Sequence, residues 1–269
     1  RNFPYDNVFN TDNPNNVDIF VNRDPRLYET MVVNRNNLVE QYQGLSSTEL
    51  WQGGNVDQTF NPAVTDNPWS TRMKLFKYLR DNGYAAYHPT NFAYLRMADI
   101  HLCYAEALAQ TGNLPKACDE MNKVRARVGL GKIEVMNPGL NLTSNKDNFI
   151  EQLLKERACE FGYEDSRWYD LIRYKRSDIF KKQVHQLRVW RKDANGNKMN
   201  PADYNDDTSL EPGEPWPNCI YEKIPCTNNT RVWWDTENQT SKWTDKWYLA
   251  PISRDEINKG YGLNQNPGW

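Results

Sequence analysis

The chain reads ERACEFGYEDSRWYDLIRY from Glu156 to Tyr174, so charges of both signs alternate with large aromatic side chains at helical spacing. Gly162 interrupts the pattern, and we expect Ser166 to cap a second helix after it. Six charged side chains lie on either side of the interruption: Glu156, Arg157, Glu160, Arg167, Asp170 and Arg173. Because the planar fork of arginine suits bidentate pairing with carboxylates, the pattern predicts a partly buried ion-pair network that joins the two helices.

The same stretch also has a catalytic interpretation, in which two of its carboxylates are the acid and base of a glycoside hydrolase. Such an enzyme needs one carboxyl group kept protonated, whereas arginines this close would hold both groups ionised. We therefore favour the structural network. The hydrolase stays as the alternative, with its acids in residues 156–170 or 203–214.

Residues 91–128 predict a helical hairpin. In residues 91–110 the apolar side chains step by three and four, which is typical of an amphipathic helix. Asn113 then caps a second helix that has Pro115 in its first turn. The small residues are spaced as in a tetratricopeptide repeat, where they let paired helices approach closely. Because one repeat cannot bury both of its faces, we expect residues 1–269 on their own to be unstable or to aggregate.

Runs of β-forming residues between Asn, Pro and Gly punctuation predict short strands outside the hairpin. The predicted strands are residues 18–21, 29–33, 72–78 and 247–252. Ser253, with Glu256 three residues later, predicts the capped start of a last short helix that runs to Asn258.

Asn195-Gly196 predicts a type I′ turn that joins residues 184–192 to residues 198–199 in a β-hairpin. The acidic and amide residues around this turn also resemble the beginning of a calcium-binding loop. Lys198 stands where that loop requires glycine, so the hairpin is the favoured interpretation.

Aromatic residues make up 13% of the chain, with ten Trp and fifteen Tyr, while only 38% of the residues are hydrophobic. Asparagine is also frequent in the segments that lack periodicity. Such surfaces suit sugar rings, because an aromatic face covers the C–H side of a pyranose while amides bridge its hydroxyls. The alternative is that these aromatic residues pin long loops to the body of the protein.

Charge and motif content exclude several classes of protein. The 33 basic and 35 acidic residues are interspersed and give a net charge of -2, so we expect no nucleic-acid partner. The sequence has no Gly-rich phosphate loop, and its three histidines lack a neighbouring nucleophile or a metal-ligand spacing. We therefore expect no cofactor, no metal site and no catalytic residues. No apolar run of about 18 residues occurs either.

The five cysteines are an odd number and show no metal-binding spacing. Cys103, Cys118 and Cys159 lie in helical patterns, where we expect small buried side chains. Cys219 and Cys226 are seven residues apart in a proline-containing segment, and both a disulfide and unpaired packing stay open for them.

Four segments resemble motifs of the SusD/RagB family, whose members are surface lipoproteins that bind glycans or other nutrients at TonB-dependent outer-membrane transporters. In chain order, the segments are NRDPRL (22–27), YLRMADIHLCYAEAL (94–108), the stretch quoted above (156–174) and NQNPGW (264–269). Their order matches that of the family, and they are distributed from residue 22 to residue 269, so the resemblance covers nearly the whole chain.

This resemblance implies a mainly α fold, with a tetratricopeptide-like helical scaffold, long irregular loops and a few short β-hairpins. We expect the chain to be the C-terminal half of such a protein: loop- and strand-rich in residues 1–90, helical in 91–176, and loop-rich with a C-terminal helix and tail in 177–269. Since the chain begins at Arg1 without a signal peptide or a lipidation cysteine, we expect those features and an N-terminal helical half to precede it.

The resemblance also implies a non-catalytic protein that captures an oligosaccharide and delivers it to a SusC-like TonB-dependent transporter. It implies a surface-exposed lipoprotein of the outer membrane, whose lipid anchor lies outside this chain. A peptide ligand is the alternative, because RagB-like members take up peptides and because aromatic and Asn side chains serve peptide backbones nearly as well.

Five aromatic residues are the candidate ligand contacts. Tyr42 and Trp51 lie in a polar excursion after the NRDPRL segment, where members of the family place part of their aromatic binding surface. Trp69, Trp233 and Trp234 lie in loop-like segments beside Asn or Asp, where helix packing does not readily explain a tryptophan.

Overall fold

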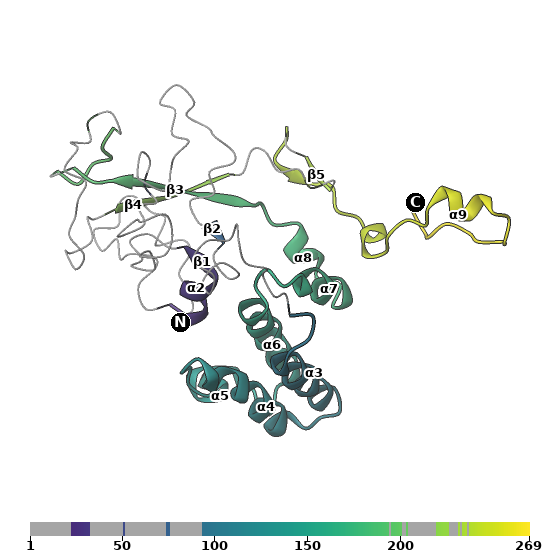
Figure 1. The fold of residues 1–269 in the computed structure, drawn as a ribbon, viewed down its shortest axis with the longest axis horizontal. Helices are drawn as coiled ribbons and strands as arrows, with labels where there is room; N and C mark the ends of the chain where they lie inside the picture. Colours follow the sequence, from purple (N-terminus) through teal and green to yellow (C-terminus); the bar gives the residue numbers. More distant parts are fainter. Residues whose placement is uncertain are drawn as a thin grey trace, which may run out of the picture. The chain divides into compact units, whose positions relative to one another are not determined.

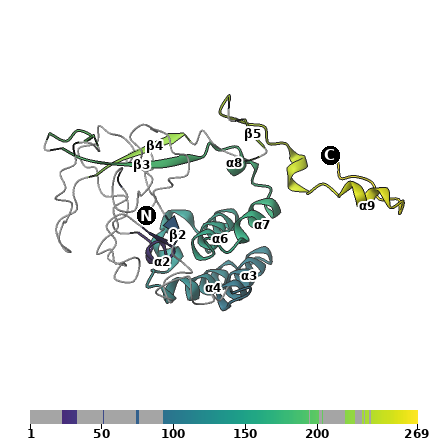
Figure 2. The same ribbon diagram turned by 45° about the horizontal axis from the view of Figure 1, so that its top comes forward.

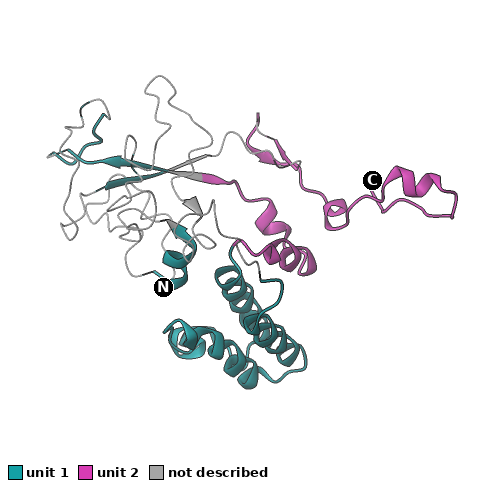
Figure 3. Cartoon of the chain, viewed as in Figure 1, with its two compact units in different colours: residues 1–162, 186–224 teal, residues 163–185, 225–269 magenta. Residues whose placement is uncertain are grey.

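The structure is a computed structural model that describes residues 23–32, 51, 74–75, 93–193, 195–200, 203, 219–225, 231, 233–235 and 237–269 (Figure 1). The chain forms two compact units (Figure 3). Unit 1 comprises residues 1–162 and 186–224, and unit 2 comprises residues 163–185 and 225–269. The predicted composition boundaries at residues 90 and 176 stay a prediction.

Three helices form the core of unit 1, and they lie side by side in both views (Figures 1 and 2): α3 (Met97–Gln110), α4 (Leu114–Arg127) and α6 (Lys146–Glu160). The first two are the predicted helical hairpin. The contact surfaces consist of small and aliphatic side chains that are almost fully buried, chiefly Leu102, Ala105, Ala109, Ala117, Met121, Phe149 and Leu153. The mainly helical fold that the sequence predicts is therefore confirmed.

The hairpin begins later than the sequence predicts. α3 starts at Met97 and not at residue 91, because the preceding residues Tyr94 and Leu95 are exposed and bury no apolar surface. The predicted cap of α4 is confirmed, since the Asn113 side chain accepts a hydrogen bond from the backbone N–H of Lys116 at 3.4 Å. α5 (Ile133–Met136) and a 3₁₀ turn, η1 (Pro138–Leu140), connect α4 to α6.

Unit 1 also contains a short helix and a small β-ladder near its beginning. Helix α2 (Pro25–Thr30) is followed by β1 (Met31–Val32), which pairs antiparallel with β2 (Lys74–Leu75). The strand predicted for residues 29–33 is thus wrong for its first two residues. Asp24 caps the start of α2 by accepting a hydrogen bond from the Arg26 N–H at 3.0 Å. The helix that begins there includes Glu29 and Thr30. The strand predicted for residues 18–21 lies outside the described residues.

A two-stranded sheet joins β3 (His185–Arg191) to β4 (Cys219–Pro225). Beyond β3 the predicted hairpin forms, with Lys192 opposite Lys198. Its turn is wider than the predicted two-residue type, because the Asp193 N–H donates to the Asn197 carbonyl at 2.8 Å. The Asp193 carboxylate accepts from the N–H groups of Asn195 and Asn197, as in an Asx-type turn and not a calcium loop.

Unit 2 contains short elements. They are α7 (Ser166–Arg173), α8 (Ser177–Phe180), β5 (Trp234–Asp235), β6 (Thr240–Ser241), the 3₁₀ helix η3 (Asp245–Tyr248) and α9 (Arg254–Asn258). β5 and β6 form an antiparallel pair, with Trp234 opposite Ser241.

Two local predictions in unit 2 are wrong and one is confirmed. Ser166 is the first residue of α7, and the capping position is Asp165, whose φ of 63° ends the preceding turn in the left-handed region. The strand predicted for residues 247–252 is absent from these described residues, because the chain turns through η3 there. Ser253 does cap α9, as predicted, by accepting a hydrogen bond from the N–H of Asp255 at 3.3 Å.

Candidate ligand-binding site

Trp51 is enclosed in unit 1. Its side chain is only 1% exposed, and the Arg191 guanidinium lies 5.8 Å from the ring centroid. The stacking role predicted for Trp51 requires an exposed ring face, and the structure does not provide one at this residue. Whether Trp51 contacts a ligand stays a prediction. Tyr42 and Trp69 lie outside the described residues.

Trp233 and Trp234 both belong to unit 2 but have different surroundings. Trp234 lies on β5 and is 7% exposed. Trp233 is half-buried, and its ring packs 5.4 Å from that of Trp168 and 5.2 Å from that of Trp243. Whether Trp233 and Trp234 contact a ligand likewise stays a prediction.

Trp233 belongs to a larger aromatic cluster, which we define as Trp168, Phe180, Trp233, Trp243, Trp247, Tyr248 and Trp269. The rings of Phe180 and Trp243 stack at 4.1 Å, and most other pairs meet edge to face or tilted, as the ring quadrupoles favour. From α7, Trp168 packs against Phe180, and Leu171 is buried beside Phe180 and Trp243. The cluster is the core of unit 2.

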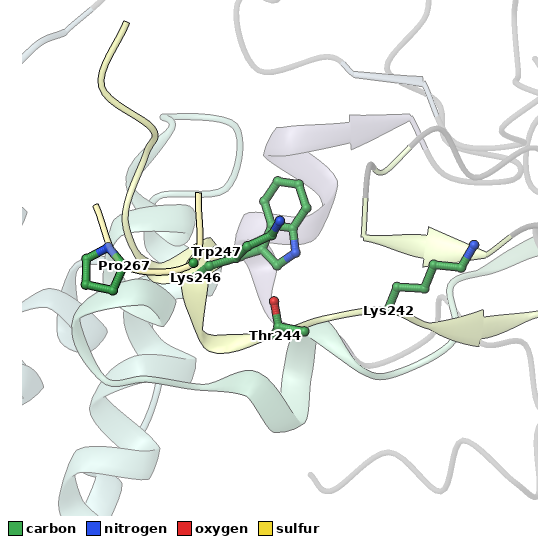
Figure 4. A pocket seen from close by; sticks show the side chains of 6 residues that line it. Lys242, Thr244, Lys246, Trp247 and Pro267 are labelled. Carbon is green, nitrogen blue, oxygen red and sulfur yellow. The ribbon is translucent and has the colours of Figure 1, made fainter. Parts of the chain in front are cut away.

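An open hollow of about 630 Å³ lies beside this cluster (Figure 4). The residues that line it are Lys242, Thr244, Lys246, Trp247, Pro267 and Gly268. Trp247 is half-buried, and its ring meets the Trp269 ring edge to face at 4.8 Å. We refer to this surface as the Trp247 hollow.

The end of the chain forms one wall of the Trp247 hollow. The indole N–H of Trp269 donates to the carbonyls of Lys246 and Leu249, at 3.0 Å each. The Gln265 side chain exchanges hydrogen bonds with the backbone of Ile252, at 2.8 and 2.9 Å. These bonds hold residues 265–269 against the segment that carries Trp247.

Gly268 permits the close approach of this wall. Its φ is +85°, a conformation that side chains rarely adopt, and a Cβ atom there would lie 3.1 Å from Cβ of Lys246. Glycine is therefore required both for the backbone conformation and for the contact.

The two lysines of the hollow differ in their charge environment. Lys242 Nζ lies 2.9 Å from Oδ2 of Asp235, and hydrogen bonds from Lys242 and Asn238 hold the pKa of the Asp235 carboxyl well below its usual value. The Lys246 ammonium lies 4.6 Å from the Trp269 ring centroid and 5.4 Å from that of Trp247. Among the described residues, no carboxylate forms an ion pair with Lys246. The hollow thus offers an indole ring, a hydroxyl and, at Lys246, a cation that forms no ion pair with the residues that the structure describes.

The chain is similar to members of one known protein family. The model of the SusD family matches residues 5–269. The chain belongs to the SusD family. Relatives include the SusD-like protein P38 of Formosa agariphila, 31% identical over 102 residues, and a SusD-like protein of Bacteroides ovatus, 32% identical over 114 residues. These matches cover 38% and 39% of this chain, but only 20% and 18% of the relatives.

A solved SusD-like protein from Bacteroides fragilis has the same fold, with a TM-score of 0.60 and 22% sequence identity. The similarity covers 93% of this chain and 40% of that structure. The SusD/RagB resemblance and the mainly α, tetratricopeptide-like fold predicted from the sequence are therefore confirmed.

Three of the motifs of this SusD-family chain meet in the ion-pair network of unit 1. Glu156 accepts a hydrogen bond from Arg26 of the NRDPRL segment and another from Arg125 of α4, each at 2.7 Å. Its side chain is only 5% exposed. The network was predicted, but these two arginines were not among the partners that the sequence indicated.

Glu160, one turn further along α6, is paired more extensively. It binds Arg26 at 3.0 Å, Arg127 at 2.9 Å and also Arg96. Burial by itself would raise the pKa of the Glu160 carboxyl, but the hydrogen bonds from Arg96 and Arg26 outweigh burial and hold that pKa below its usual value. This environment keeps Glu160 ionised and does not suit the acid of a hydrolase.

The predicted partners in α7 belong to unit 2, where Arg173 pairs with Asp170 at 3.2 Å. Whether the α7 residues also join the network of Glu156 and Glu160 stays a prediction. Sequence spacing identifies partners within a few turns of a helix, whereas the arginines that pair with Glu156 and Glu160 lie between 31 and 134 residues away in the chain.

The remaining predictions about titratable groups have mixed outcomes. His101 of α3 bridges the helical hairpin, with Nδ1 2.8 Å from Oε2 of Glu120 in α4. Cys118 is buried, and burial raises the pKa of its thiol to about 11, whereas Cys103 and Cys159 are exposed, contrary to prediction. Both lie in the described part of the chain, and Nη1 of Arg157 donates a hydrogen bond to Sγ of Cys103 at 3.8 Å. Because Cys226 lies outside that part, a disulfide with Cys219 stays a prediction.

The residues that the structure describes contain neither a membrane-spanning helix nor a metal-binding cluster. No helix there has the length and apolar character needed to cross a membrane. No three His, Cys, Asp or Glu side chains gather there in a way that would hold a metal ion.

Lys246, Trp247 and Trp269 are not among the site residues that the sequence predicts. A usable signal was present, because the NQNPGW segment that carries the family resemblance ends in Trp269 and supplies one wall of the hollow. The tryptophans of residues 233–247 were spaced too irregularly to indicate which of them would pack inward.

Proposed function

We propose that this chain is part of a non-catalytic surface protein that captures an oligosaccharide and delivers it to a SusC-like TonB-dependent transporter of the outer membrane. Membership of the SusD family supports this assignment. The observation that carries it is the Trp247 hollow, an open surface that an indole ring lines. An indole ring covers the C–H side of a sugar, and the hydroxyl of Thr244 is able to donate to or accept from sugar hydroxyls.

The proposed setting is that of the family. The protein would be held at the cell surface by a lipid anchor outside this chain, and residues 1–269 would contribute part of its ligand-binding surface. Capture does not require a catalytic pair, and none of the six residues that line the hollow carries a carboxylate. We therefore favour a binder over the glycoside hydrolase.

A glycan screen tests the proposal directly. The full-length protein would be applied to a glycan array, and each bound glycan would be titrated by calorimetry with the parent and with Trp247→Ala. We expect affinity to fall about tenfold in the variant, because the stacking surface is lost. Trp190→Ala is the matched control, since this half-buried tryptophan of β3 donates to Glu222 at 3.0 Å and lies in unit 1.

The same experiment separates the alternatives. Binding of peptides but of no glycan would favour the peptide-capturing protein. Release of reducing sugar from a mixture of glycans would favour the hydrolase. Equal glycan affinity in the parent and in Trp247→Ala would remove the hollow as the binding site.

A further inference from the structure

The charge of the Trp247 hollow is one-sided. Of the described residues that line it, two are lysines and none is acidic. In Figure 4 the Lys242 side chain extends away from Trp247, and its ammonium is neutralised by Asp235 at 2.9 Å. The Lys246 ammonium therefore supplies the positive charge of the hollow next to the indole ring.

Lys246 is held in a setting that leaves its charge only partly satisfied. The side chain is half-buried, and its ammonium lies over the rings of Trp247 and Trp269 at 5.4 and 4.6 Å. Cation–π contacts compensate only part of the hydration that an ammonium loses when it is partly buried. None of the described residues offers it a carboxylate. An anionic group placed in the hollow would form a charge-assisted hydrogen bond with it.

We infer that the Trp247 hollow takes an anionic sugar residue, with the ring on Trp247 and the carboxylate or sulfate on the Lys246 ammonium. This inference rests on the proposed function and names the class of glycan. Lysine is a compact point charge with rotatable donors, so it accepts either anion without the planar geometry that arginine imposes. A flat indole beside one cation suits a ring that carries a charged substituent better than it suits an extended peptide backbone.

The test uses the full-length protein and a glycan array that contains neutral, uronate-containing and sulfated oligosaccharides, with poly-glutamate as the acidic-peptide probe. We expect the protein to bind acidic oligosaccharides on the array. Comparison of the uronate-containing with the sulfated oligosaccharides identifies which anion is bound. The bound glycans would then be titrated with the parent and with three variants at Lys246 and Lys242.

Lys246→Gln should weaken binding of the acidic glycan about tenfold, because the charge-assisted bond is lost. Lys246→Arg should keep most of the affinity. Lys242→Gln, which makes the same change of net charge at a lysine already paired with Asp235, should have a much smaller effect. Thermal melts of the variants would show that each is folded, and the affinity of the parent should fall as salt is raised.

The outcomes distinguish this inference from the proposed function. Binding of neutral glycans only, or an acidic glycan bound equally by the parent and by Lys246→Gln, would overturn the inference while leaving the proposed function in place. Binding of poly-glutamate in preference to acidic glycans would overturn it in favour of an acidic peptide. Absence of binding to every glycan on the array would overturn both.

Discussion

Nη1 of Arg26 lies 2.7 Å from Oε1 of Glu156, although the two residues are 130 positions apart in the chain. The same guanidinium is bonded to Asp24 and Glu160, so Arg26 joins the start of unit 1 to its central helix. Its side chain is 7% exposed, and those of Glu156 and Glu160 are 5% and 0% exposed. Ion pairs this well buried are costly to break, because the partner that is left behind keeps its charge.

Removal of this guanidinium should therefore destabilise unit 1. We expect Arg26→Ala to lower the free energy of unfolding by about 3–5 kcal/mol, since it leaves buried carboxylates with fewer donors. Denaturant titration followed by tryptophan fluorescence measures the change. The control is Lys259→Ala, which breaks an exposed pair with Glu256 and should cost below about 1 kcal/mol. A loss of similar size in both variants would contradict the structural role of Arg26.

The network also predicts sensitivity to acid. Because the pKa of Glu160 is lowered in the folded protein below its ordinary value of 4.5, ionised Glu160 stabilises the fold at pH values above 4.5. This contribution is lost as the pH falls through the lowered pKa. Thermal melts between about pH 7 and pH 3 should show a steeper loss of stability in the parent than in Glu160→Gln. Parallel curves for the two proteins would refute the prediction.

Trp51→Ala separates a packing role from a ligand-contact role. Because the Trp51 side chain is 1% exposed, we expect the variant to lose about 3–5 kcal/mol of stability and to keep the glycan affinity of the fraction that folds. A thermal melt paired with a calorimetric titration checks both quantities. Retained stability with lost affinity would instead support the ligand contact that the sequence predicted for Trp51.

Gly268 offers a test of how the wall of the Trp247 hollow is held. Gly268→Ala adds both the strain of a positive φ and a contact of 3.1 Å with Cβ of Lys246. Gly262→Ala is the matched control, because its φ is +76° but no atom lies within 4 Å of the added Cβ. We expect the control to cost about 1 kcal/mol and Gly268→Ala to cost more and to weaken glycan binding. Equal effects would show that the close approach contributes nothing.

The outer face of α3 should make the 269-residue chain associate with itself. Met97, Ile100 and Tyr104 lie on one stripe and are 64%, 48% and 43% exposed, although the opposite face of the helix is already buried in the core. We expect Ile100→Lys to shift the chain toward monomer in light scattering after gel filtration. Val135→Lys, at an exposed residue of α5, is the control and should change little. A chain that is monomeric at high concentration without substitution would count against the prediction.

Local physics made several elements of this chain predictable from the sequence. The cap of α4 at Asn113, the cap of α9 at Ser253 and the hairpin that pairs Lys192 with Lys198 depend on interactions within a few residues. The apolar spacing in α3 and α4 predicts which faces meet, since each helix places residues three and four apart on one side. The order of the motifs was sufficient to indicate the family.

Tertiary structure decided which distant groups meet. The sequence predicted that Glu156 and Glu160 would pair with arginines, but the partners are chosen by the packing of α2, α4 and α6, which brings together charges far apart in the chain. The same holds for the tryptophans. An indole is large and apolar with one polar atom, so it suits a core, as in Trp51 and Trp243, and the edge of a hollow, as in Trp247. Only the folded chain determines which ring faces the solvent, because burial depends on every segment that packs against it.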